Sequence, residues 1–159
     1  MPSQALQVAE ETYEYYVLEL SSFQLDGMFE FKADIAILLN ITPDHLDWYA
    51  GNMQDYVDSK FRITQNLSED EFFVFCSDDE ITVKELERIV LKAKELPFAM
   101  KKKNQEVAYI DEDDNLRVEY GDSPFSMPVK DLALSGKHNR YNSMAAGITG
   151  NVLNIRKDV

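Results

Sequence analysis

Three side chains have the types and spacing that metal and phosphate chemistry needs: Glu19, His45 and Lys60. Glu19 lies in the run 15–25 and His45 in the run 33–47, and each run starts as an apolar strand and ends in polar residues. In open α/β sheets, ligands bind outside the carboxyl ends of the strands, where side chains from different strands converge. The pattern therefore predicts a metal or phosphate site at these strand ends.

Each of the three residues also has a simpler interpretation. A carboxylate in an apolar strand needs a cation or hydrogen bonds to offset its burial, but Glu19 could instead point to water. His45 can ligate a divalent ion beside the amides of a helix N-terminus, or it can face solvent. Lys60 lies on an inward helical stripe, where desolvation favours a neutral amine that could react with carbon dioxide to form a carbamate. Alternatively, the Lys60 stem packs and its ammonium reaches water.

A second group of polar side chains lies near the end of the chain, in the pattern His138-Asn139-x-x-Asn142. The two carboxamides are three residues apart, so they share one face of the opening turn of a helix. Such amides pair well with a purine edge or a sugar. The alternative is that an asparagine at this position only caps the helix.

The elements that must position these residues follow from the hydrophobic pattern. The run 33–41 is almost wholly apolar, which is typical of a strand buried on both faces in a parallel sheet. Apolar steps of three and four residues predict helices, one of them opened by a Thr82-x-x-Glu85 capping box and ended by Pro97. Alternating runs around a polar turn predict a small antiparallel hairpin. The predicted elements are helices over 3–12, 53–67, 83–96 and 141–152, strands over 15–20, 33–41 and 71–76, and a hairpin of 107–110 with 116–120.

Composition points to one α/β domain: the chain has 159 residues, of which 45% are hydrophobic and 28% charged. Its 29 acidic and 16 basic residues give a net charge of -13, which repels a nucleic-acid backbone. The one cysteine, Cys76, lies in an apolar run and forms no internal disulfide, which fits a reducing cytoplasm. No apolar run approaches the ~20 residues that cross a bilayer, and no signal peptide is visible.

Four ordered motifs, spanning nearly the whole chain, resemble those of the Mur ligase family. They are residues 18–25 (LELSSFQL), 40–47 (NITPDHLD), 59–62 (SKFR) and 136–142 (GKHNRYN). The SSFQL variant is similar to the members that join D-glutamate to UDP-N-acetylmuramoyl-L-alanine during peptidoglycan precursor synthesis. The resemblance implies ATP-dependent amide-bond formation, in which a substrate carboxylate is phosphorylated and the acyl phosphate is attacked by the amine of D-glutamate.

The resemblance also implies roles for individual residues, with Mg²⁺ and ATP as cofactors. Glu19 and His45 would be linked to magnesium, and Lys60 would be a carbamylated lysine that positions metal and phosphate. These three would form the catalytic group. Ser21 and Gln24 would touch the UDP-muramoyl substrate. The adenine side would be formed by His138, Asn139 and Asn142.

One departure from the family pattern is large. Family members carry a Gly-rich phosphate loop ending in Gly-Lys-Ser/Thr upstream of the Glu19 strand, and the chain has no such sequence. Residues 1–159 are therefore expected to be a partial central ATP-binding domain, without the N-terminal UDP-binding and C-terminal domains of the family. We expect the isolated chain to be inactive, and we expect an unpaired sheet edge to favour self-association.

Two other functions remain open from the residues alone. The first is a metal-dependent hydrolase that uses His45 and a carbamylated Lys60, although two-metal hydrolytic sites generally need several histidines and the chain has 2. The second is a non-enzymatic acidic interaction domain, in which Glu19, His45 and Lys60 are unconnected. A ligase predicts that the three meet around one cavity.

Overall fold

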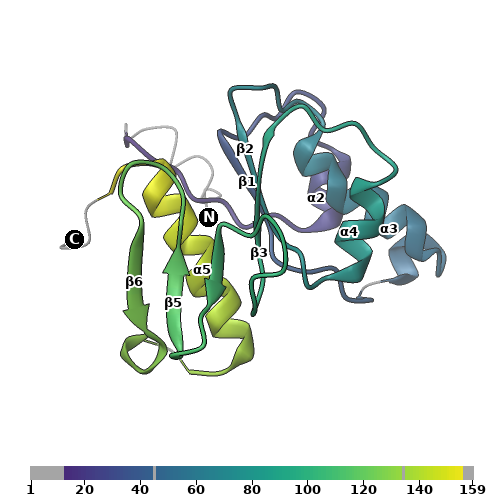
Figure 1. The fold of residues 1–159 in the computed structure, drawn as a ribbon. Coiled ribbons are helices and arrows are strands. Elements are labelled where there is room, and N and C mark those ends of the chain that lie inside the picture. Colours follow the sequence, from purple (N-terminus) through teal and green to yellow (C-terminus); the bar gives the residue numbers. More distant parts are fainter. Residues whose placement is uncertain (1–12, 45, 134, 156–159) are drawn as a thin grey trace, which may run out of the picture.

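The computed structural model describes residues 13–44, 46–133 and 135–155, which form a six-stranded sheet with helices packed against it (Figure 1). The strands are β1 (Ile35–Leu38), β2 (Phe72–Cys76), β3 (Lys94–Phe98), β4 (Ala108–Ile110), β5 (Asn115–Val118) and β6 (Phe125–Pro128). The helices are α2 (Ser22–Asp26), α3 (Met53–Phe61), α4 (Glu80–Leu86) and α5 (Lys137–Val152), with 3-10 turns η1 (Leu46–Tyr49), η2 (Arg62–Thr64) and η3 (Val129–Asp131).

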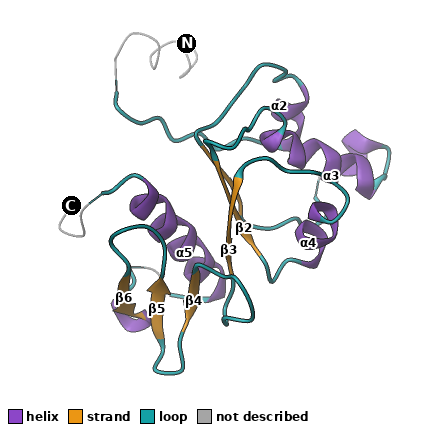
Figure 2. Ribbon diagram, turned by 45° about the horizontal axis from the view of Figure 1, so that its top comes forward, coloured by secondary structure: helices purple, strands orange, loops and turns teal. Residues whose placement is uncertain are grey.

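The strands follow the order of the sequence across the sheet, from β1 to β6. β1 to β4 pair in parallel, and β4, β5 and β6 pair antiparallel. In Figures 1 and 2, α2, α3 and α4 lie together near β1 to β3, whereas α5 lies against the part of the sheet that contains β4 to β6. The predicted α/β class, with a mostly parallel sheet and a small antiparallel hairpin, is confirmed.

The core divides into two clusters because side chains alternate between the two faces of a strand. On β2, Phe73 and Phe75 pack in the cluster that contains α3, whereas Val74 and Cys76 pack in the cluster that contains α5. The buried α3 members are Tyr56, Val57 and Phe61, and the buried α5 members are Met144, Ala145 and Ile148. β2 is thus covered on both sides, which explains its run of apolar residues.

The predicted helix over 83–96 is wrong. α4 spans Glu80–Leu86, and the segment that follows it turns into β3, where Leu96 and Phe98 are buried and Glu95 is exposed. This period of two is that of a strand, and pairing with β2 outweighs the helical pattern. The capping residue also differs from the prediction, because Asp79 precedes the helix and accepts a hydrogen bond from the backbone N–H of Thr82.

The predicted strand over 15–20 is also wrong. The segment has no regular structure, and Val17 is 98% exposed. A strand needs a neighbouring strand for its hydrogen bonds, and within the described ranges β1 pairs with β2 alone. The helix expected over 53–67 stops at Phe61 and continues as η2. The helix expected over 3–12 lies outside the described residues.

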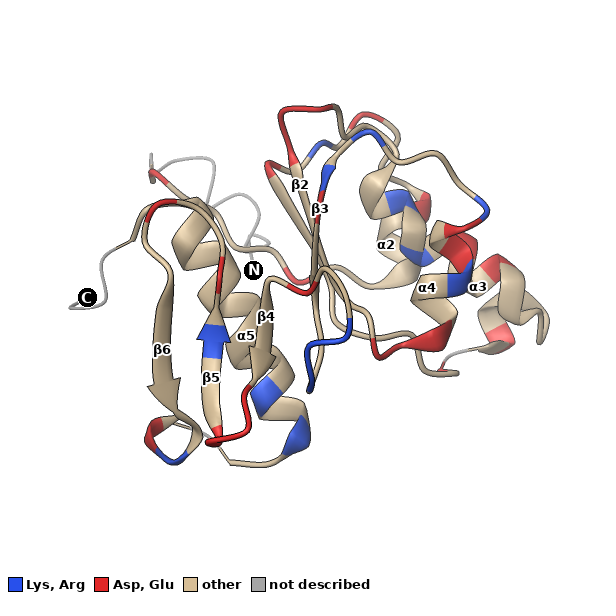
Figure 3. Ribbon diagram, viewed as in Figure 1, with Lys and Arg blue, Asp and Glu red and all other residues tan. Residues whose placement is uncertain are grey.

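The strands expected over 33–41 and 71–76, the hairpin and the C-terminal helix are confirmed as β1, β2, β4 with β5, and α5. Among the residues that the structure describes, none of the helices combines the length and the apolar character needed to span a membrane. Figure 3 shows the acidic residues spread over several helices, turns and strand ends, as expected for a solvated acidic surface.

Candidate functional site

Three segments that are far apart in the sequence meet where α2, η1 and α3 pack together. The Ser59 hydroxyl of α3 donates a hydrogen bond of 2.7 Å to the carbonyl oxygen of Ser22 in α2. The Tyr49 hydroxyl of η1 lies 3.0 Å from Ser59 Oγ and 3.3 Å from Asp26 Oδ2. These bonds join the segments that contain Ser21, Asp44 and Lys60.

The two residues expected to touch a substrate, Ser21 and Gln24, form the N-terminal turn of α2. Gln24 Oε1 accepts hydrogen bonds from the Ser21 backbone N–H at 2.9 Å and from the Ser21 hydroxyl at 2.8 Å. This reciprocal arrangement is a capping box, which fixes the start of a helix of only five residues. Gln24 is exposed and Ser21 is half-buried, so their polar atoms lie at the surface.

Lys60 lies on α3 between the buried residues Ser59 and Phe61, and it is itself half-buried. Its Nζ lies 5.4 Å from the centre of the Tyr56 ring. Burial lowers the pKa of Lys60, and the negative charge of Asp44 opposes that shift. The negative charge of Asp44 also raises the pKa of Tyr56. The segment before position 45 thus lies within electrostatic reach of both the Tyr56 hydroxyl and the Lys60 amine.

Glu19 lies in surroundings that differ from the predicted ones. The predicted burial of Glu19 in an apolar strand is wrong, because Glu19 is exposed in a stretch without regular structure. His45 lies outside the described residues. Its flanking segment is held on one side, where the backbone N–H of Ile41 donates to Asp79 Oδ2 at 3.3 Å, and on the other side by Tyr49. Within the described ranges, no cluster of three or more His, Cys, Asp or Glu side chains could hold a metal ion.

The second predicted group occupies the first turns of α5. The helix begins at Lys137 after Gly136, whose φ of 101° favours glycine. Asn139 lies inside the helix, so the expectation that it caps the helix is wrong, and its side-chain nitrogen instead donates to the Ser135 carbonyl oxygen at 2.7 Å. His138 and Asn142 are exposed.

Two aspartates that the sequence reasoning missed hold these segments to the end of β2. Asp79 Oδ2 accepts from the backbone N–H of Ile41, and Asp78 Oδ2 accepts from the Tyr141 hydroxyl at 3.0 Å. The position of Asp79 before an apolar helical pattern is an N-cap signal that could have been found in the sequence. No local signal indicates the bonds of Ser59, Tyr49 or Tyr141.

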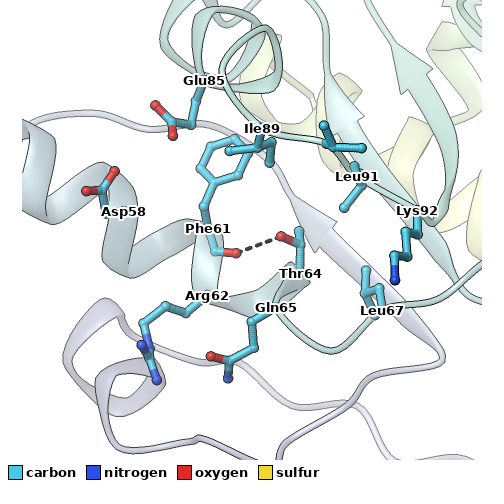
Figure 4. A pocket seen from close by; sticks show the side chains of 11 residues that line it. Asp58, Phe61, Arg62, Thr64, Gln65, Leu67, Glu85, Ile89, Leu91 and Lys92 are labelled. Carbon is cyan, nitrogen blue, oxygen red and sulfur yellow. Dashed lines mark hydrogen bonds between the residues drawn. The ribbon is translucent and has the colours of Figure 1, made fainter.

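A cavity of about 440 Å³ lies between α3, η2 and the region after α4 (Figure 4). Its lining includes Asp58, Phe61, Glu85 and Lys92, and Figure 4 shows Arg62 directed toward α2. The Arg62 Nε donates to the Leu25 carbonyl oxygen at 2.9 Å, which further ties η2 to α2. Among the described residues, Glu19, Ser21, Gln24, Lys60, His138, Asn139 and Asn142 do not line this cavity, so it is separate from the candidate site.

Comparison with known proteins identifies the class of the chain. Residues 1–150 match the model of the Mur ligase middle domain, and the chain belongs to this family. The solved structure of MurF from Acinetobacter baumannii has a similar fold, with a TM-score of 0.57 over 80% of this chain and 27% of that one. Because the sequence identity is 16%, this similarity concerns the fold alone.

The curated relatives specify one branch of the family. A UDP-N-acetylmuramoylalanine--D-glutamate ligase of Bacteroides thetaiotaomicron is 52% identical over 156 residues, which cover 98% of this chain and 35% of that protein. A protein of the same name from Porphyromonas gingivalis is 44% identical over 157 residues. The chain thus spans about a third of the length of these relatives.

Proposed function

We propose that this chain is the central segment of an ATP-dependent ligase that joins D-glutamate to UDP-N-acetylmuramoyl-L-alanine, the activity named MurD in this family. The support is twofold. Relatives with that ligase name are 44 to 52% identical over 98% of the chain. The segments expected to bind metal, phosphate and muramoyl substrate are also joined by the hydrogen bonds of Ser59 and Tyr49.

The proposed magnesium site lies beside Lys60 and requires a carbamate on its amine, because the described His, Cys, Asp and Glu side chains form no metal cluster by themselves. Magnesium prefers oxygen ligands, and Asp44 supplies a carboxylate within electrostatic reach of Lys60. A neutral amine reacts with carbon dioxide, and burial moves Lys60 toward the neutral form. As a carbamate, Lys60 would place negatively charged oxygens beside this segment, with His45 and Glu19 as further proposed ligands.

The remaining residues of the site would bind and orient the two substrates. MgATP, when bound, supplies the phosphoryl group that activates the substrate carboxylate. Ser21 and Gln24 would present their polar atoms to the UDP-muramoyl substrate from the fixed first turn of α2. His138, Asn139 and Asn142 would hold the adenine side from α5. A fixed orientation lowers the entropic cost of reaction between bound groups.

The observation that carries this proposal is the convergence of α2, η1 and α3 at Ser59. We would test it with a ligase chimera, defined as the B. thetaiotaomicron relative in which the matching 156 residues are replaced by those of this chain. The relative supplies the remaining parts of the enzyme. Expected is ADP release that depends on D-glutamate and UDP-N-acetylmuramoyl-L-alanine, and a folded chimera without turnover would refute the ligase assignment.

The 159-residue chain alone should release no ADP, because its sequence has no Gly-Lys-Ser/Thr phosphate loop. We also propose that it acts in the cytoplasm, which is supported by its single buried, unpaired cysteine.

Self-association through the β1 edge is a further part of the proposal. Within the described residues, the sheet ends at β1, which has a partner strand on one side. Unpaired edges of this kind can pair with another chain. Sedimentation of the 159-residue chain should show a dimer that forms at high concentration, and a monomer at all concentrations would contradict it.

A further inference from the structure

Two consecutive carboxylates, Asp78 and Asp79, follow Ser77 just past the end of β2, where ligand sites form in parallel sheets. Neither belongs to the predicted site. Each nevertheless contacts one of the segments that the proposed function requires, and the two segments differ.

Asp79 holds the segment that leads to His45. One oxygen, Oδ2, accepts hydrogen bonds from the Ile41 backbone N–H at 3.3 Å, from the Thr82 backbone N–H at 3.0 Å and from the Thr82 hydroxyl at 2.5 Å. Thr82 is fully buried, so this end of α4 is fixed within the fold. The Asp79 carboxylate therefore holds Ile41, and the residues 42–44 that follow it, at a fixed place relative to the start of α4.

Asp78 holds α5. Its Oδ2 accepts from the Tyr141 hydroxyl at 3.0 Å and from the Met100 backbone N–H at 2.7 Å, while Oδ1 accepts from Lys103 Nζ at 2.7 Å. Burial opposes the charged form, but the bonds from Lys103, Met100 and Tyr141 prevail and lower the pKa of Asp78. An ionised carboxylate makes the stronger hydrogen bond.

Tyr141 is well placed to fix the start of α5. It lies between Asn139 and Asn142, whereas the fully buried positions Met144 and Ile148 anchor the helix further along. Burial and the bond to Asp78 raise the pKa of Tyr141, so its hydroxyl stays protonated and donates. The Tyr141 ring also contacts Phe98 of β3, with centroids 6.1 Å apart.

We propose that Asp78 and Asp79 are a pair of positioning residues, in which Asp78 orients the nucleotide-binding start of α5 through Tyr141 and Asp79 orients the metal-binding segment through Ile41. The inference rests on the proposed function for what the two segments bind. The positioning itself is a property of the 159-residue chain. Through this pair, the end of β2 sets the distance between the two halves of the site.

The first experiment measures hydrogen exchange on the 159-residue chain. Tyr141→Phe should speed exchange at the amides of Arg140 and Tyr141 about tenfold, as expected for loss of one hydrogen bond to a charged group. Tyr109→Phe is the matched control, since the Tyr109 hydroxyl donates to Glu119 at 2.7 Å and Tyr109, unlike its neighbours Ala108 and Ile110, is not part of the cluster that packs against α5. Unchanged exchange in Tyr141→Phe, or equal changes at α5 in both variants, would overturn the role of Asp78.

The role of Asp79 is tested by hydrogen exchange in two variants, because removal of a helix cap can unfold the chain. Asp79→Ala should speed exchange at the Ile41 amide and at the first turn of α4. Asp79→Ser keeps a capping oxygen but is shorter, so exchange should increase at Ile41 while α4 stays protected. If Asp79→Ser leaves the Ile41 amide fully protected, Asp79 does not position that segment.

The second experiment places Tyr141→Phe in the ligase chimera. We expect the KM for ATP to rise about tenfold, with little change in kcat or in the KM for UDP-N-acetylmuramoyl-L-alanine. A merely structural residue would lower the amount of active enzyme and leave the KM for ATP unchanged, which would overturn the inference. An inactive, folded parent chimera would instead refute the ligase assignment, and the exchange experiment would still decide the positioning.

Discussion

The hydroxyl of Ser59 donates a 2.7 Å hydrogen bond to the carbonyl oxygen of Ser22, which joins α3 to α2 beside Lys60. Both residues are buried, with 3% and 4% of their surface exposed. Ser59 Oγ also accepts a hydrogen bond of 3.0 Å from the Tyr49 hydroxyl. A single side chain thus connects three segments, and its removal should be felt in all of them.

Ser59→Ala should lower the free energy of unfolding by about 1–3 kcal/mol, because a buried carbonyl oxygen loses its donor. Urea unfolding followed by circular dichroism measures this difference. Ser126→Ala is the control, since Ser126 is exposed on β6 and such changes stay within about 0.5 kcal/mol. Equal stability of the two variants would show that the Ser59 bond contributes nothing.

Glu71 should make the chain sensitive to acid. A hydrogen bond from Lys32, followed by bonds from the hydroxyl and backbone of Ser68, lowers the pKa of Glu71 from 4.5 to about 2. The folded state therefore favours ionised Glu71, so this stabilisation is complete above pH 4.5 and is lost as the pH falls toward about 2.

Thermal unfolding as a function of pH tests this expectation. The Tm of the parent chain should fall more steeply below pH 4.5 than that of Glu71→Gln. Glu95→Gln, on an exposed residue of β3, makes the same change of charge and should keep the parental slope. A parental slope in Glu71→Gln would contradict the assignment.

Two glycines of α5 should respond oppositely to alanine. A Cβ at Gly147 would lie 3.0 Å from Phe125 and from Val118, whereas a Cβ at Gly150 meets no atom within 4 Å. Gly150→Ala should stabilise the helix by about 0.5–1 kcal/mol. Gly147→Ala should lower the free energy of unfolding by about 1 kcal/mol, because the cost of overpacking exceeds the gain in helix propensity. Unfolding in urea decides, and an equal gain in both variants would show that the sheet does not confine Gly147.

The thiol of Cys76 should be inert in the folded chain. Burial raises its pKa to about 11, and the thiolate is the reactive form. At pH 8, a thiol reagent such as dithionitrobenzoate should label the chain rapidly in urea and very slowly without urea. Rapid labelling of the native chain would contradict the burial of Cys76 in the cluster that contains α5.

The sequence predicts the parts of the fold that local pattern controls. β1 and β2 follow from apolar runs, the β4–β5 hairpin from alternation around a polar turn, and α5 from small and apolar residues at helical spacing. β3 was missed because Leu96 also fits the helical spacing that starts at α4. Its pairing with β2 depends on residues about twenty positions away, which no local window contains.

In the candidate site, too, local sequence pattern predicts some features, whereas others depend on residues distant in the sequence. The half-buried state of Lys60 was predictable from its place on the apolar stripe of α3. The exposure of Glu19 was not, since the strand prediction assumed a partner that β1 does not provide among the described residues. The bonds of Ser59, Asp78 and Asp79 join positions that are 37, 63 and 38 residues apart. Such contacts become visible only when the chain is folded.

The proposed role of Lys60 in a ligase site is tested most directly by D-glutamate-dependent ADP release from the ligase chimera carrying Lys60→Ala. Lys94→Ala is the matched control, because both amines lie over an aromatic ring, Lys60 at 5.4 Å from Tyr56 and Lys94 at 5.0 Å from Phe72. Removal of a preorganised charge from a phosphoryl-transfer site should lower kcat at least about 100-fold. We predict that loss for Lys60→Ala and parental activity for Lys94→Ala. Parental activity in a folded Lys60→Ala chimera would contradict a role of Lys60 in the reaction.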